Sequence, residues 1–311
     1  AFFDRVAFEA TAAQLQQHYF NLGYYLVEDT AFAEQNGKKV VAHYQINTGP
    51  QYNISAYNLR STSRFIDSAL AHYPKELELG DALNAQRIED EQLALTNFLK
   101  DHGYFTAQLG WVYFEIDTTG GPNASEITGV VDPFIFGGLD ERQRISKITV
   151  RPTYSFQEAN TVNDSTRTVH GIDVLQNDRL FRPGFLDEQI YLERGAFYDQ
   201  NLLRTTYKNL SSLGVFQTVE VNVQPKENAL HAPLNLVPLP KRSVSANLEG
   251  LGNSGSLGVG GSFNWDNRNL FKGGETLRLS LGGALTEQRN SSSTSWLIDA
   301  RELNAGVSLH L

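Results

Sequence analysis

The stretch RTTYKNLSSLGVF at residues 204–216 places a helical segment, a glycine and the start of a strand in direct succession. Tyr207, Leu210 and Leu213 in this stretch, together with Leu203 just before it, recur at the spacing of one helix face. Gly214 follows them, and glycine readily adopts the left-handed conformation that ends a helix. The next residues, Val215 and Phe216, favour a strand.

The same junction occurs twice more along the chain. One copy runs through Leu15, Tyr19 and Leu22 into Gly23-Tyr24-Tyr25, with Thr11 and Gln14 as a capping box at the helix start. Another runs through Ile88, Leu95, Phe98 and Leu99 into Gly103-Tyr104-Phe105. A single helix–glycine–strand junction is common, but recurrence at three places predicts a repeated unit. Gly23, Gly103 and Gly214 are therefore expected to be structural junctions.

The flanking segments give the unit an order of strand, two helices and two strands. In the middle copy we expect a strand at 52–59, helices at 63–72 and 84–101, and strands at 104–117 and 126–136. Asn84 is the expected N-cap of the second helix. In the last copy we expect a strand at 145–151, helices at 185–193 and 200–213, and strands at 215–223 and 229–239. Residues 152–170 are polar and fit an inserted loop. The first copy has a strand at 38–48 but lacks an opening strand and first helix, so the chain is expected to start inside a domain.

From Ser243 onward the hydrophobic period becomes two. Val244, Ala246 and Leu248 alternate with Ser245, Asn247 and Glu249, and later segments alternate in the same way, at 257–265, 276–282 and 305–311. Strands of this kind have one apolar face and one small or polar face, as outer-membrane barrel strands do. An ordinary antiparallel sheet with one buried face gives the same pattern. The length of the strands, their glycines and the lack of a covering sheet favour the barrel.

The phase of the alternation slips between Ala300 and Leu303, which predicts a bulge or an omitted residue there. Four or five strands cannot close a barrel, so the natural protein is expected to continue past Leu311.

Composition excludes several other classes of protein. A net charge of −9 argues against nucleic acid as the main partner. The chain has no cysteine, which excludes disulfides and thiolate sites. No run of about 18 apolar residues is present, so no transmembrane helix is expected.

We expect no catalysis, no cofactor and no metal site. Residues 250–255 spell GxGxxG, but a strand rather than a helix follows, so a hairpin turn is favoured over a dinucleotide site. The seven histidines form no HxxxH or HxH pair that would indicate a metal site.

The chain resembles the outer-membrane protein-assembly superfamily of POTRA domains plus a barrel, which is BamA- or TamA-like, and it is most similar to the version found in Bacteroidota. The resemblance rests on Gly103-Tyr104-Phe105, on residues 204–216, on PLNLVPLPKR at 233–242 and on LGVGGSFNWDNRNLFKGGETLRLSL at 257–281. The last stretch contains a hairpin with Asn269, Gly273 and Gly274 at its turn.

The resemblance implies α+β tandem POTRA domains (β-α-α-β-β) followed by the first strands of an antiparallel transmembrane β-barrel. The expected domains are a partial POTRA domain at 1–48, POTRA domains at 49–143 and 144–241, and N-terminal barrel strands at 242–311. The expected location is the outer membrane of a Gram-negative bacterium, with the POTRA arm in the periplasm. The expected partners are unfolded outer-membrane protein clients, accessory lipoprotein or periplasmic subunits, and outer-membrane lipid.

The resemblance further implies a protein-insertion function in which the first barrel strand offers its edge to a client strand. The expected client-binding residues are Ser243, Val244, Ser245, Ala246, Asn247, Leu248, Glu249 and Gly250. Gly250 and Gly252 would weaken pairing at the far end of this strand, or they merely serve the hairpin. A two-partner-type secretion pore is the alternative, although at least three repeated units favour assembly. A passive porin or a soluble scaffold explains less, since a porin needs no repeated arm and a scaffold needs no lipid-facing leucines.

Overall fold

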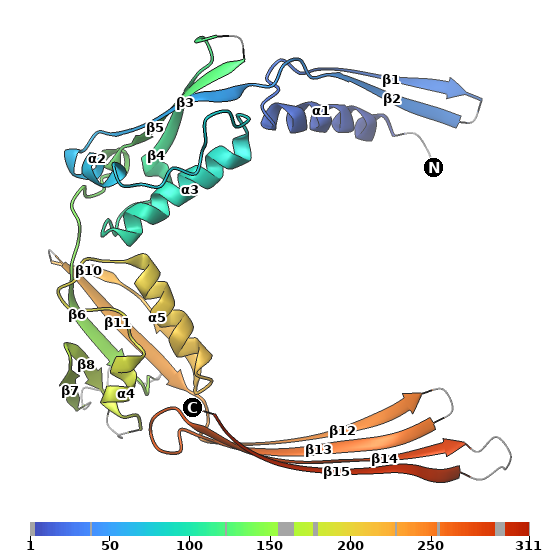
Figure 1. Cartoon of the computed structure of the whole chain (residues 1–311), viewed down its shortest axis with the longest axis vertical. Coiled ribbons are helices and arrows are strands. Elements are labelled where there is room, and N and C mark those ends of the chain that lie inside the picture. The colour runs from blue at the N-terminus through green and yellow to red at the C-terminus, as the bar shows by residue number, and fades with distance from the viewer. Residues whose placement is uncertain are drawn as a thin grey trace. The chain divides into compact units, whose positions relative to one another are not determined.

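The structure is a computed structural model that describes residues 4–37, 39–121, 123–154, 165–176, 180–227, 229–253, 256–289 and 296–310. It divides into two compact units (Figure 1). The first contains Ala1–Gln143 with Phe197–Gln200, and the second contains Arg144–Ala196 with Asn201–Leu311.

The first unit begins with helix α1 (Arg5–Asn21) and an antiparallel hairpin of strands β1 (Glu28–Asn36) and β2 (Lys39–Asn47). The helix is capped by Asp4, whose carboxylate accepts hydrogen bonds from the backbone N–H groups of Val6 and Ala7. The capping box predicted at Thr11 and Gln14 is therefore wrong. Thr11 lies inside the helix, where its hydroxyl donates to the Ala7 carbonyl at 2.7 Å. Asp4 at the N-cap satisfies the free amides of the first turn, so the helix begins earlier in the chain than the sequence pattern indicated.

The rest of the first unit contains the predicted strand, two helices and two strands. These are β3 (Asn53–Ser61), α2 (Arg64–Leu70), α3 (Ala85–Asp101), β4 (Val112–Asp117) and β5 (Ala124–Val131). The sheet order is β3-β5-β4, with β3 parallel and β4 antiparallel to the central β5. The side chain of Asn84 accepts a hydrogen bond from the Gln86 amide, as the N-cap prediction requires. Leu95, Leu99 and Trp111 are fully buried in the core under the sheet.

Two strands of this unit are shorter than predicted, because short 3₁₀ turns interrupt them. β4 starts only after the turn Leu109–Trp111, and β5 ends before the turn Pro133–Phe136. Proline has no N–H to continue a strand ladder. The Asp132 carboxylate accepts a hydrogen bond from the Phe134 amide and caps the turn.

The second unit repeats the topology with β6 (Ile145–Arg151), α4 (Pro183–Glu188), α5 (Gln200–Ser212), β9 (Phe216–Val221), β10 (Gln224–Lys226) and β11 (Ala229–Pro238). β6 is parallel and β9 antiparallel to the central β11, like β3 and β4 beside β5. Helix α4 ends at Glu188 rather than at residue 193 as predicted, although Ile190 and Leu192 remain buried.

The region predicted as a polar loop at 152–170 departs from the expectation at its end. Thr166–Val169 forms strand β7, which pairs with β8 (Ile172–Leu175), and β8 lies parallel to β6. Ile172 and Val174 are buried against the core, and this burial favours the hairpin over a solvated loop. Residues 155–164 lie outside the described residues.

The chain ends in an antiparallel sheet with the strand order β12-β13-β14-β15. The strands are Arg242–Asn253, Ser256–Arg268, Thr276–Arg289 and Trp296–His310. The register shifts between Thr286 and Glu287, which pair with Ala300 and Ile298 and leave Asp299 as the extra residue. The bulge predicted between Ala300 and Leu303 is thus real but lies at Asp299, just before that interval. No described helix is long and apolar enough to cross a membrane.

Candidate functional site

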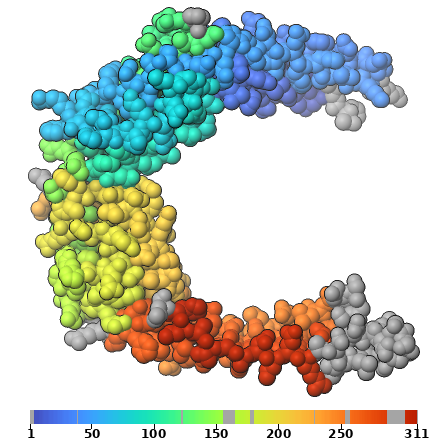
Figure 2. All heavy atoms as spheres, in the orientation of Figure 1, coloured from blue at the N-terminus to red at the C-terminus, as the bar shows by residue number. Residues whose placement is uncertain are grey.

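The four-stranded sheet places apolar side chains of all its strands on one face. Directly paired residues share a face, and the register brings together the row Ala246, Phe263, Leu281 and Ala305 and the row Val244, Trp265, Leu279 and Val307. Much of this face is solvent-exposed, with Leu248 at 89% and Leu303 at 88%. Figure 1 shows the strands side by side as a single layer, and Figure 2 draws the atoms of the same segment in orange to red. Such a surface favours contact with lipid or with another apolar partner.

The predicted client-binding residues all lie in β12, one of the two edge strands of this sheet. β12 pairs with β13 over its whole length, from Arg242 opposite Asn267 to Asn253 opposite Ser256. Its other edge has no paired strand among the described residues. Ser243, Ser245, Asn247 and Glu249 face the polar side, while Val244, Ala246 and Leu248 face the apolar side.

The polar contacts of β12 are concentrated at its first residues. The Ser243 hydroxyl lies 3.3 Å from the Asp266 carboxylate and accepts a hydrogen bond from Arg268 at 3.0 Å. Asp266 is nearly buried and also pairs with Arg278 at 2.7 Å. At the opposite end, Gly250 and Gly252 have open space where a side chain would lie. Side-chain hydrogen bonds therefore hold β12 at Ser243, whereas mainly backbone pairing holds it toward Gly250 and Gly252.

A second feature of the sheet is the turn between β13 and β14, residues 269–275. Asn269 has a positive φ of 56°, and its side chain donates to the Leu180 carbonyl at 2.7 Å and accepts from the Gly274 amide at 3.1 Å. The Arg182 amide donates to the Lys272 carbonyl at 2.8 Å. The turn is thus docked on the segment that leads into α4.

Glu275 holds this turn from within. Its carboxylate accepts hydrogen bonds from the amides of Phe271 (3.2 Å) and Gly273 (3.0 Å) and pairs with Arg182 at 3.1 Å. A side chain at Gly273 would collide with Arg182, and one at Gly274 would collide with Phe185. The predicted junction residues Asn269, Gly273 and Gly274 therefore meet in one turn. Arg182 and Glu275 were not singled out from the sequence, because 92 intervening residues separate them from each other in the chain and no local pattern links them.

The other predicted junctions are helix ends rather than parts of this site. Gly23, Gly103 and Gly214 have positive φ values of 93°, 101° and 67°, each directly beyond a helix. This is the conformation for which glycine carries no side-chain penalty.

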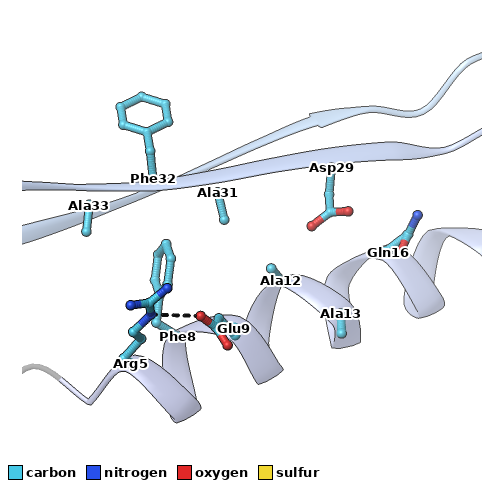
Figure 3. Close-up of a pocket in the computed structure, with 10 residues that line it drawn as sticks. All are labelled: Arg5, Phe8, Glu9, Ala12, Ala13, Gln16, Asp29, Ala31, Phe32 and Ala33. Atoms are coloured by element: carbon cyan, nitrogen blue, oxygen red, sulfur yellow. Dashed lines mark hydrogen bonds and ion pairs between the residues drawn. The ribbon is translucent and has the colours of Figure 1, made fainter.

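A groove of about 540 Å³ lies between α1 and β1 in the first unit (Figure 3). Asp29, Ala31 and Ala33 point from the strand toward the helix, and Phe8 rises from the helix beside them. The equivalent strand β4 has bulkier residues at its paired core positions, such as Val112 and Phe114. The small alanines leave the groove open on its strand side, and Arg5, Glu9 and Asp29 make part of its lining charged.

The structure was searched for side chains that could bind a metal ion. No group of three or more histidine, aspartate or glutamate side chains that could hold a metal ion is found among those residues.

No protein-family model matches the chain, and no curated protein sequence matches it. Solved structures similar to it include POTRA domains 3–5 of Haemophilus influenzae BamA, with 20% identity and a TM-score of 0.41, covering 74% of this chain and 80% of that one. BamA from Haemophilus ducreyi lacking POTRA domains 1–3 has 17% identity and a TM-score of 0.47, covering 78% and 44%. CdiB from Acinetobacter baumannii has 13% identity and a TM-score of 0.34, covering 93% and 52%.

This chain therefore spans less than half of the Haemophilus ducreyi BamA chain and about half of CdiB.

Proposed function

We propose that the chain is the periplasmic arm and first barrel strands of an outer-membrane protein-assembly factor. The factor would be BamA- or TamA-like and related to the Bacteroidota version. The proposed domains are a partial POTRA domain at 1–48, POTRA domains at 49–143 and 144–241, and barrel strands at 242–311. The proposal is supported by the recurring β-α-α-β-β topology and by the exposed apolar face of β12–β15.

The observation that carries the proposal is the position of β12, the first strand of an apolar-faced sheet, at one of the two edges of that sheet. An edge strand presents backbone N–H and C=O groups that pair with an extended segment of almost any sequence. Sequence-independent pairing suits a factor with many clients. In the proposed mechanism, a client strand adds to β12 and extends the sheet, with its apolar residues continuing the lipid-facing side.

The contacts along β12 give this addition a direction. Ser243 is tied to Asp266 and Arg268, whereas the Gly250 end has no side chain to pack. Glycine in a strand weakens pairing. In a closed barrel, the seam between the first and last strands would therefore part first at the glycine end, while the docked turn at 269–275 keeps β13 and β14 in place.

The arm contributes a holding surface in this proposal. We infer that the groove between α1 and β1, which has the small residues Ala31 and Ala33 on its strand side, holds an extended client segment (Figure 3). A weak, shallow groove suits transfer because the client must be released to the membrane.

The test uses single cysteines, which is straightforward because the chain has none. Ser245→Cys is placed in β12 of the full-length protein, and a second cysteine is placed in the terminal strand of a stalled client. Ser280→Cys is the matched control: Ser245, Asn264 and Ser280 share one row of the polar face, but Ser280 lies on the inner strand β14. We expect disulfides in cells from Ser245 and not from Ser280. Equal cross-linking, or none at Ser245 while the arm cross-links, would rule out strand addition at β12.

A further inference from the structure

The C-terminal sheet is basic at the end where it joins the arm. β12 starts there with Arg242, and the turn between β13 and β14 lies at the same end. Within residues 239–242 and 266–278, the acidic residues are Asp266 and Glu275, and both are nearly buried and pair with arginines. The basic residues of the same two segments are Lys241, Arg242, Arg268, Lys272 and Arg278.

Three of these basic side chains have no acidic partner. Lys241, Arg242 and Lys272 are exposed, and their side chains form no ion pair or hydrogen bond with another described residue. Backbone hydrogen bonds hold them near one another. The Arg268 amide donates to the Lys241 carbonyl at 2.7 Å, and the Lys272 amide donates to the Asn269 carbonyl at 3.4 Å. Positive charge therefore gathers at this rim of the sheet, although the whole chain has a net charge of −9.

Arg242 lies on the apolar face of the sheet. It shares that face with Val244, which lies two residues along β12 and pairs with Trp265. Val244 is 63% exposed, and its row lies about 7 Å from the row of Arg242. Arg242 therefore stands at the border of the exposed apolar surface. Its own row also contains Asn267, Leu277 and Leu309.

A second arginine ends the same face at the far end of the sheet. Arg301 lies in the register row of Gly250, which is eight residues from Arg242 in β12. Eight residues of strand span roughly 26 Å at about 3.3 Å per residue. Between these two rows, none of the described residues places a charged side chain on this face. The charge-free band is of the same order as the lipid-facing band of outer-membrane barrels, about 25 Å.

We propose that Arg242 binds the phosphate of an anionic phospholipid headgroup at this rim. A guanidinium group binds phosphate oxygens through paired N–H donors, and Lys241 and Lys272 add attraction for a net negative headgroup. The acyl chains of the same lipid would cover the exposed surface at Val244, which a free phosphate ion would leave uncovered. The inference rests on the proposed function, in which β12–β15 face lipid, and it adds the class of lipid.

The test uses Trp265 as a reporter, because it lies one row from Arg242. Trp296→Phe removes the other tryptophan of the sheet, and Trp111 is fully buried in the first unit. The full chain is placed in non-ionic detergent micelles that contain phosphatidylglycerol or phosphatidylcholine. Each lipid carries bromine atoms on one acyl chain, which quench tryptophan fluorescence on contact.

We expect half-maximal quenching at a mole fraction of phosphatidylglycerol about tenfold lower than that of phosphatidylcholine, because each basic residue near an anionic headgroup strengthens binding severalfold. Equal mole fractions would overturn the proposal. So would millimolar inorganic phosphate that abolishes the difference at constant ionic strength, because the site would then prefer the free ion.

Substitutions on the apolar face locate the site. Arg242→Gln should reduce the preference for phosphatidylglycerol about fivefold, and Arg242→Lys should retain most of it because the charge remains. The Arg242 side chain has no partner among the described residues, so the sheet should stay folded. Arg301→Gln is the matched control, since it removes an exposed arginine from the same face in the row of Gly250, and it should leave the preference unchanged. A full preference in Arg242→Gln, or equal losses in Arg242→Gln and Arg301→Gln, would refute the site assignment.

The same measurement separates this proposal from the proposed function. Loss of the lipid preference with intact cross-linking at Ser245 would refute the headgroup site and leave strand addition at β12 standing. Absence of quenching by either lipid would refute the lipid-facing sheet, on which both proposals rest.

Discussion

An ion pair between Glu275 and Arg182 joins the docked turn at 269–275 to the segment that leads into α4, and its two partners differ greatly in burial. The residue Glu275 is 6% exposed, whereas the Arg182 side chain is 61% exposed. We predict that Glu275→Ala loosens the turn far more than Arg182→Ala does. Removing the carboxylate leaves the Phe271 and Gly273 amides without an acceptor, and unsatisfied donors in partly buried sites cost about 1–3 kcal/mol each. The loss of an exposed ion pair costs about 0–1 kcal/mol.

Hydrogen exchange at residues 269–275 of the full chain in detergent measures this difference locally. A cost of about 2–3 kcal/mol corresponds to exchange accelerated roughly 30-fold or more in Glu275→Ala, compared with less than about fivefold in Arg182→Ala. The exchange of α5 is the internal control, because it is remote from the turn in sequence. If Arg182→Ala accelerates exchange as much as Glu275→Ala, the ion pair and not the backbone hydrogen bonds holds the turn, and the reasoning is refuted.

The same carboxylate predicts a pH dependence. Burial by itself raises the pKa of Glu275, but hydrogen bonds from backbone amides and the Arg182 charge outweigh it and lower the pKa below its ordinary value. A lowered pKa in the folded state means that the contribution is complete above the unfolded carboxyl pKa of about 4.3. It is lost as pH falls through the lower folded value. Protection of the turn, corrected for intrinsic exchange, should therefore be level near neutral pH and decline only in acid. Glu275→Gln should lack that decline.

Three further predictions concern the rest of the chain. Gly→Val at Gly103 or Gly214 should lower the stability of residues 1–241 by about 1 kcal/mol or more, as measured by thermal melts. The loss should be larger at Gly103, where Arg142 Nε would lie 3.1 Å from the new Cβ. Unchanged melts would contradict the junction argument. Residues 1–241 should be soluble, whereas 1–311 should need detergent because of the apolar face of β12–β15; a monodisperse detergent-free 1–311 preparation would defeat the barrel assignment. Tyr57→Phe should lower the free energy of unfolding in urea by about 1–3 kcal/mol, because the fully buried Glu91 loses the 2.7 Å hydrogen bond from the Tyr57 hydroxyl. An unchanged free energy would show that solvent or another donor replaces this hydrogen bond.

The sequence by itself determined the elements whose signals are local. Helical spacing followed by glycine located the ends of α1, α3 and α5, because a helix must stop where its backbone turns left-handed. The period of two located β12–β15 and separated their two faces, because side chains alternate across a strand. The pattern erred where a single polar side chain decided the boundary, as Asp4 does at the start of α1.

Only the tertiary structure decided which distant residues meet. The register between strands places Ser245 and Ser280 in one row, and sequence alternation alone fixes a face but no row. The docking of Glu275 on Arg182 and of Asn269 on Leu180 depends on packing between the C-terminal sheet and the α4 segment, with chain separations of about 90 residues. Such contacts follow from the mutual fit of whole elements, and no local pattern of residues encodes that fit.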